Sequence, residues 1–198
     1  MKLGVIFLFS SLLSISSFEQ KWTYSSGDNA FDGEYKSASV KGTGGNYPYQ
    51  HPILVVNYFI KSDQMNIYFT DAGYAGCEKK IAFFKFDNDS IIYKFFVTTN
   101  SDKDVWFIEK YSYGVSNISV VELLEKMKNH NKVDVRLSSS CGQNDYQFSL
   151  SGSSVAIDFV ALKYMKVQKQ ILTTQKKEED NRRLLNDSFF LANILKQK

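Results

Sequence analysis

Apolar residues recur at every second position through much of the first two thirds of the chain, which is the spacing of strands with one buried face. The segment 53–60 is instead almost continuously apolar, so it is predicted to be a central strand covered on both faces. After a polar turn, Met65, Ile67 and Phe69 share one face of the segment 65–70. The two segments are predicted to form a β-hairpin.

A second hairpin is predicted from two aromatic-rich segments, 81–86 and 91–97, which flank the polar turn Asp87-Asn88-Asp89-Ser90. Residues 22–32 are expected to be a polar lead-in. The first strand, 35–40, is expected to end at the glycine cluster formed by Gly42, Gly44 and Gly45. The remaining predicted strands are 35–40, 105–108, 132–137 and 145–150.

The pattern changes to a helical period near residue 120. Apolar residues at i, i+3, i+4 and i+7 predict a helix over 120–130, and Ser119 with Glu122 has the spacing of a capping box. A second helix is predicted to follow the break at Gly152-Ser153-Ser154. Residues 168–198 contain neither Gly nor Pro and carry an apolar stripe, so they are also predicted to be helical.

Composition agrees with a strand-rich fold, since the chain holds sixteen Phe and twelve Tyr but two Pro. We predict a mainly β fold with α elements: an antiparallel β-sandwich or open barrel with two short helices and a helical C-terminal extension. The predicted organisation is a signal peptide at 1–17, a β-rich globular domain at 18–162 and a basic helical tail at 163–198.

The N-terminal segment has the features of an export signal. Lys2 precedes an apolar run that is too short to anchor the chain in a bilayer, and small side chains at Ser14 and Ser16 suit a signal peptidase. We expect cleavage after Ser16 or Ser17, a secreted or periplasmic mature chain, and no transmembrane segment after cleavage. Three Asn-x-Ser sequences leave a eukaryotic secretory source open.

The net charge of +3 is unevenly distributed. From residue 163 onward nine Lys or Arg stand against four Asp or Glu. Such a basic tail could meet an acidic partner, a lipid surface or nucleic acid, and export makes nucleic acid the least expected of the three. A protein partner is predicted, either a second copy or an envelope component. The alternative is that the apolar stripe packs on its own domain. Candidate docking residues are Arg182, Arg183, Phe189 and Phe190.

The expected mature chain has two cysteines, Cys77 and Cys141, an even number in an oxidising compartment. A disulfide between them is predicted, and two unpaired thiols are the alternative.

The order of short motifs in the second half, from Phe84-Lys85-Phe86-Asp87 through Val105-Trp106-Phe107 to Tyr146-Gln147-Phe148-Ser149-Leu150-Ser151-Gly152, resembles that of a group of exported bacterial proteins. This group includes the type VI secretion-associated protein VasI, and the resemblance covers about residues 52–160. It implies an accessory or binding role at the envelope, without catalytic residues to carry over. The family's own cysteine positions are not present, so the Cys77–Cys141 bond would be a different one.

Candidate chemistry is sparse, because only His51 and His130 are histidines and neither has metal-ligand spacing. The turn Asp87-Asn88-Asp89-Ser90 lacks the glycine and glutamate of a calcium loop, and Gly42-Thr43-Gly44-Gly45 precedes a strand, whereas a phosphate loop opens a helix. No catalytic residue, cofactor or metal is predicted.

Aromatic residues in predicted loops offer one further possibility. Tyr47, Tyr49 and Tyr74 have flat faces and polar neighbours, the combination that stacks on sugars. The sequence therefore predicts a noncatalytic binding or accessory protein of the cell envelope, with a glycan-binding module as the alternative.

Overall fold

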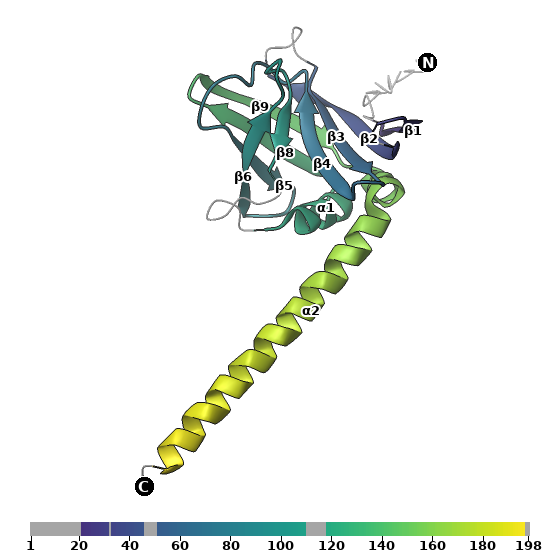
Figure 1. Cartoon of the computed structure of the whole chain (residues 1–198). Coiled ribbons are helices and arrows are strands. Elements are labelled where there is room, and N and C mark those ends of the chain that lie inside the picture. Colours follow the sequence, from purple (N-terminus) through teal and green to yellow (C-terminus); the bar gives the residue numbers. More distant parts are fainter. Residues whose placement is uncertain (1–20, 32, 46–50, 110–117, 197–198) are drawn as a thin grey trace, which may run out of the picture.

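A computed structural model describes residues 21–31, 33–45, 51–109 and 118–196 (Figure 1). In the last helix the side chains are described up to Arg183, apart from residues 176 and 179. The elements are β1 (Thr23–Asn29), β2 (Gly33–Gly44), β3 (Ile53–Phe59), β4 (Gln64–Thr70), β5 (Ile81–Phe86), β6 (Ile92–Thr99), β7 (Trp106–Ile108), α1 (Val120–Asn129), β8 (Lys132–Ser139), β9 (Gly142–Ser149) and α2 (Ser153–Lys196). The predicted signal peptide lies outside the described residues.

Eight strands form a closed antiparallel barrel in the order β2-β3-β4-β7-β6-β5-β8-β9, and β9 pairs back to β2. Both predicted hairpins are confirmed, as β3–β4 and as β5–β6. The mainly β class with helices is therefore correct, and the architecture is a barrel rather than a sandwich, but the barrel is closed and not open as predicted. The closing contact joins strands that are about one hundred residues apart, and no local pattern in the sequence reports such a pairing.

Glycines make the closure possible. Gly42 lies opposite Phe148, and a side chain at this position would clash with the Phe148 ring. Gly44 has φ +102°, and a side chain there would clash with the carbonyl oxygen of Asp145. The glycine cluster was predicted to end the first strand, whereas β2 continues through Gly42 to Gly44 and pairs there with β9.

A ninth strand, β1, pairs with β2 outside the barrel, so the prediction of a polar lead-in was wrong. β1 occupies the edge of β2 over residues 33–39, and β9 takes over the same edge at residues 42–44. The ring of Tyr24 on β1 packs edge-to-face against Phe159 of α2, with 5.4 Å between the centroids. Most side chains of β1 are exposed, which explains why its sequence lacks an apolar alternation.

Aromatic side chains fill the barrel. Phe69 packs against Phe84 and Phe148, and Phe84 packs edge-to-face against Phe95, with centroid separations of 5.6 to 6.0 Å. All four rings are completely or almost completely buried. The strand β3 is covered on both faces as predicted, because Val55 and Asn57 on its outer side are also buried.

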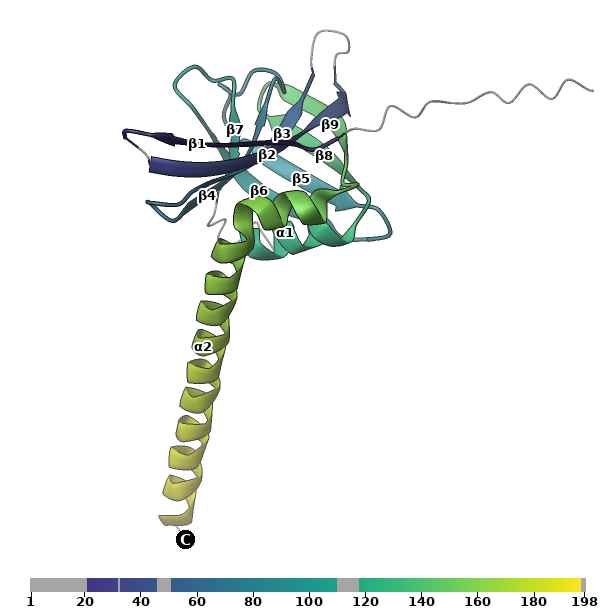
Figure 2. The same ribbon diagram turned by 90° about the vertical axis from the view of Figure 1, so that its right-hand side faces the viewer.

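The two helices lie together at one end of the barrel (Figure 2). The predicted capping box is confirmed: Ser119 Oγ accepts from the Glu122 amide, and the Glu122 carboxylate accepts from the Ser119 amide. Leu123, Leu124 and Met127 of α1 are completely buried in the core. α2 is joined to α1 by a buried hydrogen bond from Ser153 Oγ to the carbonyl oxygen of Met127, 2.6 Å long.

The second predicted helix and the predicted helical tail are one continuous helix, α2, of 44 residues. Its first turns lie beside α1, and the rest extends away from the barrel (Figures 1 and 2). Tyr164 and Met165 are the last residues of α2 that are described as buried. We call residues 166–196 the α2 extension.

Candidate functional site

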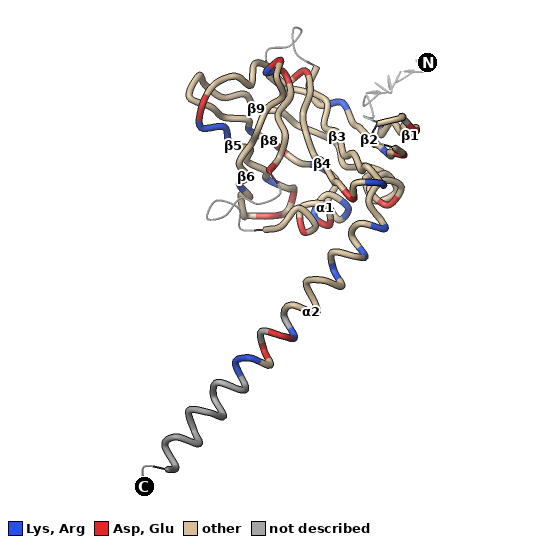
Figure 3. Tube along the Cα trace, viewed as in Figure 1, with Lys and Arg blue, Asp and Glu red and all other residues tan. Residues whose placement is uncertain are grey.

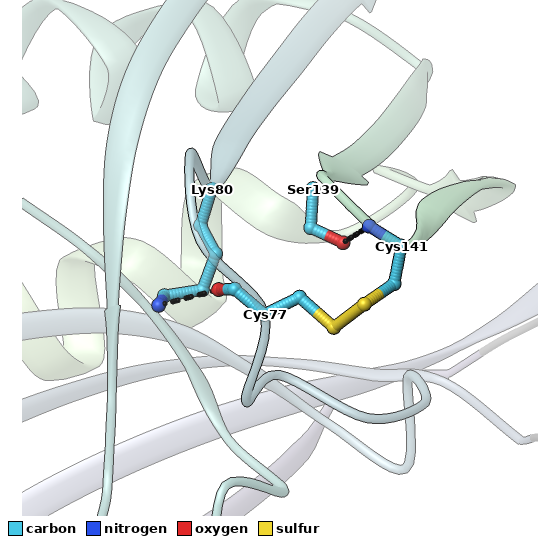
Figure 4. Close-up of a disulfide and its surroundings, with 4 residues drawn as sticks. All are labelled: Cys77, Lys80, Ser139 and Cys141. Carbon is cyan, nitrogen blue, oxygen red and sulfur yellow. Dashed lines mark hydrogen bonds between the residues drawn. A yellow bond between two sulfur atoms is a disulfide. The ribbon is translucent and has the colours of Figure 1, made fainter.

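The predicted disulfide is confirmed. Cys77 and Cys141 are bonded with their Cα atoms 6.0 Å apart, and no free cysteine remains in the described part of the chain (Figure 4). The surrounding loops are also hydrogen-bonded, because Lys80 Nζ donates to the Cys77 carbonyl and the Cys141 amide donates to Ser139 Oγ. The bond attaches the loop 71–80 to the turn between β8 and β9.

The loop 71–80 covers the barrel end that lies away from the helices. Ala72 and Ala75 are completely buried there. Tyr146 donates its hydroxyl hydrogen bond to the Ala72 carbonyl at 2.9 Å, and burial raises the pKa of Tyr146 to about 12. Trp106 Nε1 donates to the Gly73 carbonyl at 3.0 Å. The barrel thus holds this loop in one position.

One of the three loop tyrosines is described. Tyr74 is 62 % exposed and its hydroxyl lies over Gly76. It borders a depression of about 430 Å³ together with Asp71, Asp102 and Lys103. Tyr47 and Tyr49 lie outside the described residues, so their position relative to Tyr74 remains a prediction.

A shallow groove of about 810 Å³, here called the outer groove, runs over the outside of β5, β6, β8 and β9. Several of its charged residues have partners within the sheet. Arg136 makes two hydrogen bonds to Asp145 at 2.6 and 2.7 Å, which lower the pKa of the Asp145 carboxyl. Gln147 Nε2 donates to Asp134, and Lys94 Nζ lies 5.7 Å from the centre of the Phe83 ring. These contacts are typical of a solvated sheet face. The sequence could not reveal the groove, because its residues meet only through the strand register.

A cluster of polar groups joins the β5–β6 turn to α1. Asp89 Oδ2 accepts hydrogen bonds from Lys126 Nζ and the Tyr93 hydroxyl, both 2.7 Å long, and Oδ1 accepts from the Ile91 amide. The hydrogen bond from Lys126 is the main cause that holds the pKa of Asp89 far below its usual range. In the same turn, Asp87 accepts from the amides of Asn131 and Lys132. Both carboxylates therefore have structural partners in the turn that superficially resembled a calcium loop.

The histidines show no sign of acting together. His130 follows α1 and its ring lies 4.9 Å from that of Phe86, while Nδ1 is 2.7 Å from the Lys126 carbonyl oxygen and donates to it. The His51 amide donates to Asp71. Among the described residues there is no group of three or more potential metal ligands.

The α2 extension carries the predicted docking residues. Val167, Ile171 and Leu172 are exposed apolar side chains on it, and Arg182 and Arg183 are exposed as well. Between Lys166 and Arg183, basic residues are followed by acidic residues and then by basic residues again (Figure 3). Phe189 and Phe190 belong to the helix, but their side chains lie outside those that are described.

Within the described residues, no helix has both the length and the apolar character needed to cross a membrane. The disulfide fits an oxidising, extracytoplasmic compartment. Comparisons of the chain with protein-family models, curated proteins and solved structures found no match.

Proposed function

We propose that this protein is an exported, noncatalytic binding or accessory protein of the cell envelope, and that the α2 extension docks on a protein partner. The apolar N-terminal segment and the disulfide support export. The resemblance to the VasI group adds an association with a secretion system to the proposal.

The observation that carries the proposal is that α2 leaves the barrel while it still presents apolar side chains. Val167, Ile171 and Leu172 are between 38 and 48 % exposed. The extension is about 45 Å long at 1.5 Å per residue. A helix gains most of its stability from packing an apolar face against something else. A partner that covers one apolar face of the extension would supply that packing.

The barrel is a weaker candidate for the binding surface than the α2 extension. The charges of the outer groove are largely paired within the sheet, and the polar groups of the Asp89 cluster bond to one another. We therefore place the binding surface on the helix and regard the barrel as its rigid support.

Lysine-directed cross-linking of the purified full-length mature protein, added to native envelope extract, tests this proposal. Lys166, Lys169 and Lys177 are exposed on the extension, whereas Lys85 and Lys94 are exposed on the barrel. We expect intermolecular cross-links on the three extension lysines to one defined protein, whether a second copy or an envelope component. Intermolecular cross-links confined to the barrel lysines would contradict the proposal.

Glycan binding remains the second candidate, and the exposed ring of Tyr74 beside a polar depression favours it. A glycan array probed with the full chain tests it. Tyr74→Ala should abolish binding, whereas Tyr24→Ala, which removes a tyrosine from the outer strand β1, should not. Equal binding by both variants would exclude Tyr74 as a sugar-stacking residue.

A further inference from the structure

We propose that the partner of the α2 extension is the α2 extension of a second copy of this chain, paired antiparallel with Glu178 of each copy at the two-fold axis. The inference rests on the proposed docking role and names the partner. It depends on one row of residues along α2.

The row starts on the barrel and continues into solvent. Val160 and Tyr164 are almost completely buried in the core. Val167 and Ile171 follow at helical spacing and are 38 and 43 % exposed. By sequence the same row continues through Thr174, Glu178, Arg182, Leu185 and Phe189.

This row stays in line along a straight helix. The positions 167, 178 and 189 are 11 residues apart, as are 171 and 182, and 174 and 185. Eleven residues make three helical turns to within about 20°, so an 11-residue spacing keeps a row on one face with little supercoiling. The extension can therefore present this row to a second straight helix over its whole length.

The row of one copy is complementary to the same row of a second copy that runs antiparallel to it. With Glu178 opposite Glu178, Ile171 falls opposite Leu185 and Val167 falls opposite Phe189. Two-fold symmetry repeats each apolar pair, so that four apolar layers flank a polar centre. A shift of four residues in either direction leaves two apolar layers instead of four, because Asn181 then falls opposite Ile171 or Asn193 falls opposite Val167. The sequence thus favours one register.

Charge favours the antiparallel direction. In a parallel pair in register, Glu178 would meet Glu178 and Arg182 would meet Arg182. In the antiparallel pair Arg182 faces Thr174, and it lies one turn from Glu178 of the second copy. The two glutamates and two arginines then alternate in sign around the axis, which offsets the repulsion between the glutamates.

The row also faces away from the contact that holds the start of the extension. Lys169 Nζ donates to Glu125 of α1 at 2.7 Å. Lys169 is about 200° around the helix from Ile171, on the opposite side. The hydrogen bond to α1 therefore lies on the face of α2 opposite the row, and Val167 and Ile171 remain exposed to solvent.

Sedimentation of the full-length mature protein tests the pairing. We expect a reversible dimer that Ile171→Glu weakens by about 100-fold or more, because it introduces charges into two symmetry-related apolar layers. Leu172→Glu is the matched control: Leu172 is next in sequence and similarly exposed at 48 %, but it lies off the row. Leu172→Glu should remain dimeric, and both variants should keep the circular dichroism of the native chain.

Cysteine cross-linking tests the register. Glu178→Cys should form a disulfide-linked dimer on mild oxidation, because the two introduced thiols meet at the axis. Lys169→Cys lies on the far side of the helix and should not. A monomeric native protein, equal loss of dimer in both glutamate variants, or equal cross-linking of both cysteine variants would overturn the pairing. Extension cross-links from a monomeric protein to another envelope protein would overturn the pairing but leave the docking role intact.

Discussion

At the scale of single residues, Asp89 shows how one carboxylate joins separate elements. It accepts hydrogen bonds from its own turn, from β6 and from α1. Because these bonds favour the charged form, the folded-state pKa lies below the unfolded value of about 4. The stabilisation is therefore fully present above that unfolded value and is lost as the pH falls through the folded pKa.

Asp89→Asn should therefore lower the melting temperature at pH 7, and the difference from the native protein should shrink as the pH falls from 5 toward 2. Thermal unfolding of both proteins across this pH range measures the effect. Asp102→Asn is a suitable control, since that aspartate lies in an exposed turn and should change little. A difference that is constant with pH would show that the charge of Asp89 is unimportant.

A second prediction at the scale of single residues concerns Gly44. This residue has a left-handed backbone conformation and lies where β2 pairs with β9 to close the barrel. Gly44 and Gly142 have φ of +102° and +135°, so Ala at either position strains the backbone. Only at Gly44 does the added carbon also meet the backbone of β9, whereas nothing lies within 4 Å at Gly142. We expect Gly44→Ala to cost roughly 1–3 kcal/mol more than Gly142→Ala in urea unfolding. Equal costs would mean that the closure tolerates a side chain.

At the scale of elements, the disulfide connects two parts of the barrel that are distant in the sequence. The bonded cysteines are 64 residues apart, and they join the loop after β4 to the turn before β9. In the chain-entropy model a cross-link over such a loop stabilises the fold by about 4 kcal/mol.

The double variant Cys77→Ala, Cys141→Ala should lose a stability of this order in urea unfolding, with the native circular dichroism retained. The single variants Cys77→Ala and Cys141→Ala control for the change of side chain. Each of them also removes the cross-link, so each should lose as much stability as the double variant. A double variant as stable as the native protein would show that the bond is dispensable for the fold.

Elements fixed by neighbouring residues could be predicted from the sequence. The capping box at Ser119 and Glu122 and the polar turns of both hairpins act over a few residues, and all appear in the structure. The absence of Gly and Pro after residue 168 likewise indicated a long helix.

Elements fixed by distant partners could not be predicted. β1 has mostly exposed side chains and is defined by its pairing with β2. The closure depends on Gly42 and Gly44 meeting β9, and a glycine cluster alone indicates a turn as readily as a close approach of two strands. The outer groove and the Asp89 cluster depend on the same long-range register.

At the scale of the whole molecule, the barrel and the α2 extension differ in how they depend on each other. Tyr164 and Met165 are buried in the barrel core, while the side chains described beyond residue 170 are exposed. Near that boundary, Lys169 of the helix donates a hydrogen bond to Glu125 of α1. The barrel should therefore need α2 only as far as about residue 170.

Two truncated chains test this boundary in dilute solution, where association contributes little to the measured stability. A chain that ends at Leu162 lacks the two buried side chains and should lose roughly 5 kcal/mol or fail to fold cooperatively, since large core deletions cost 2–5 kcal/mol each. A chain that ends at Gln170 keeps both side chains and the Lys169 bond, so its free energy of unfolding should match that of the full chain within about 0.5 kcal/mol. If the second truncation were as damaging as the first, the extension would be part of the barrel's own core packing, and a docking role for it would lose its basis.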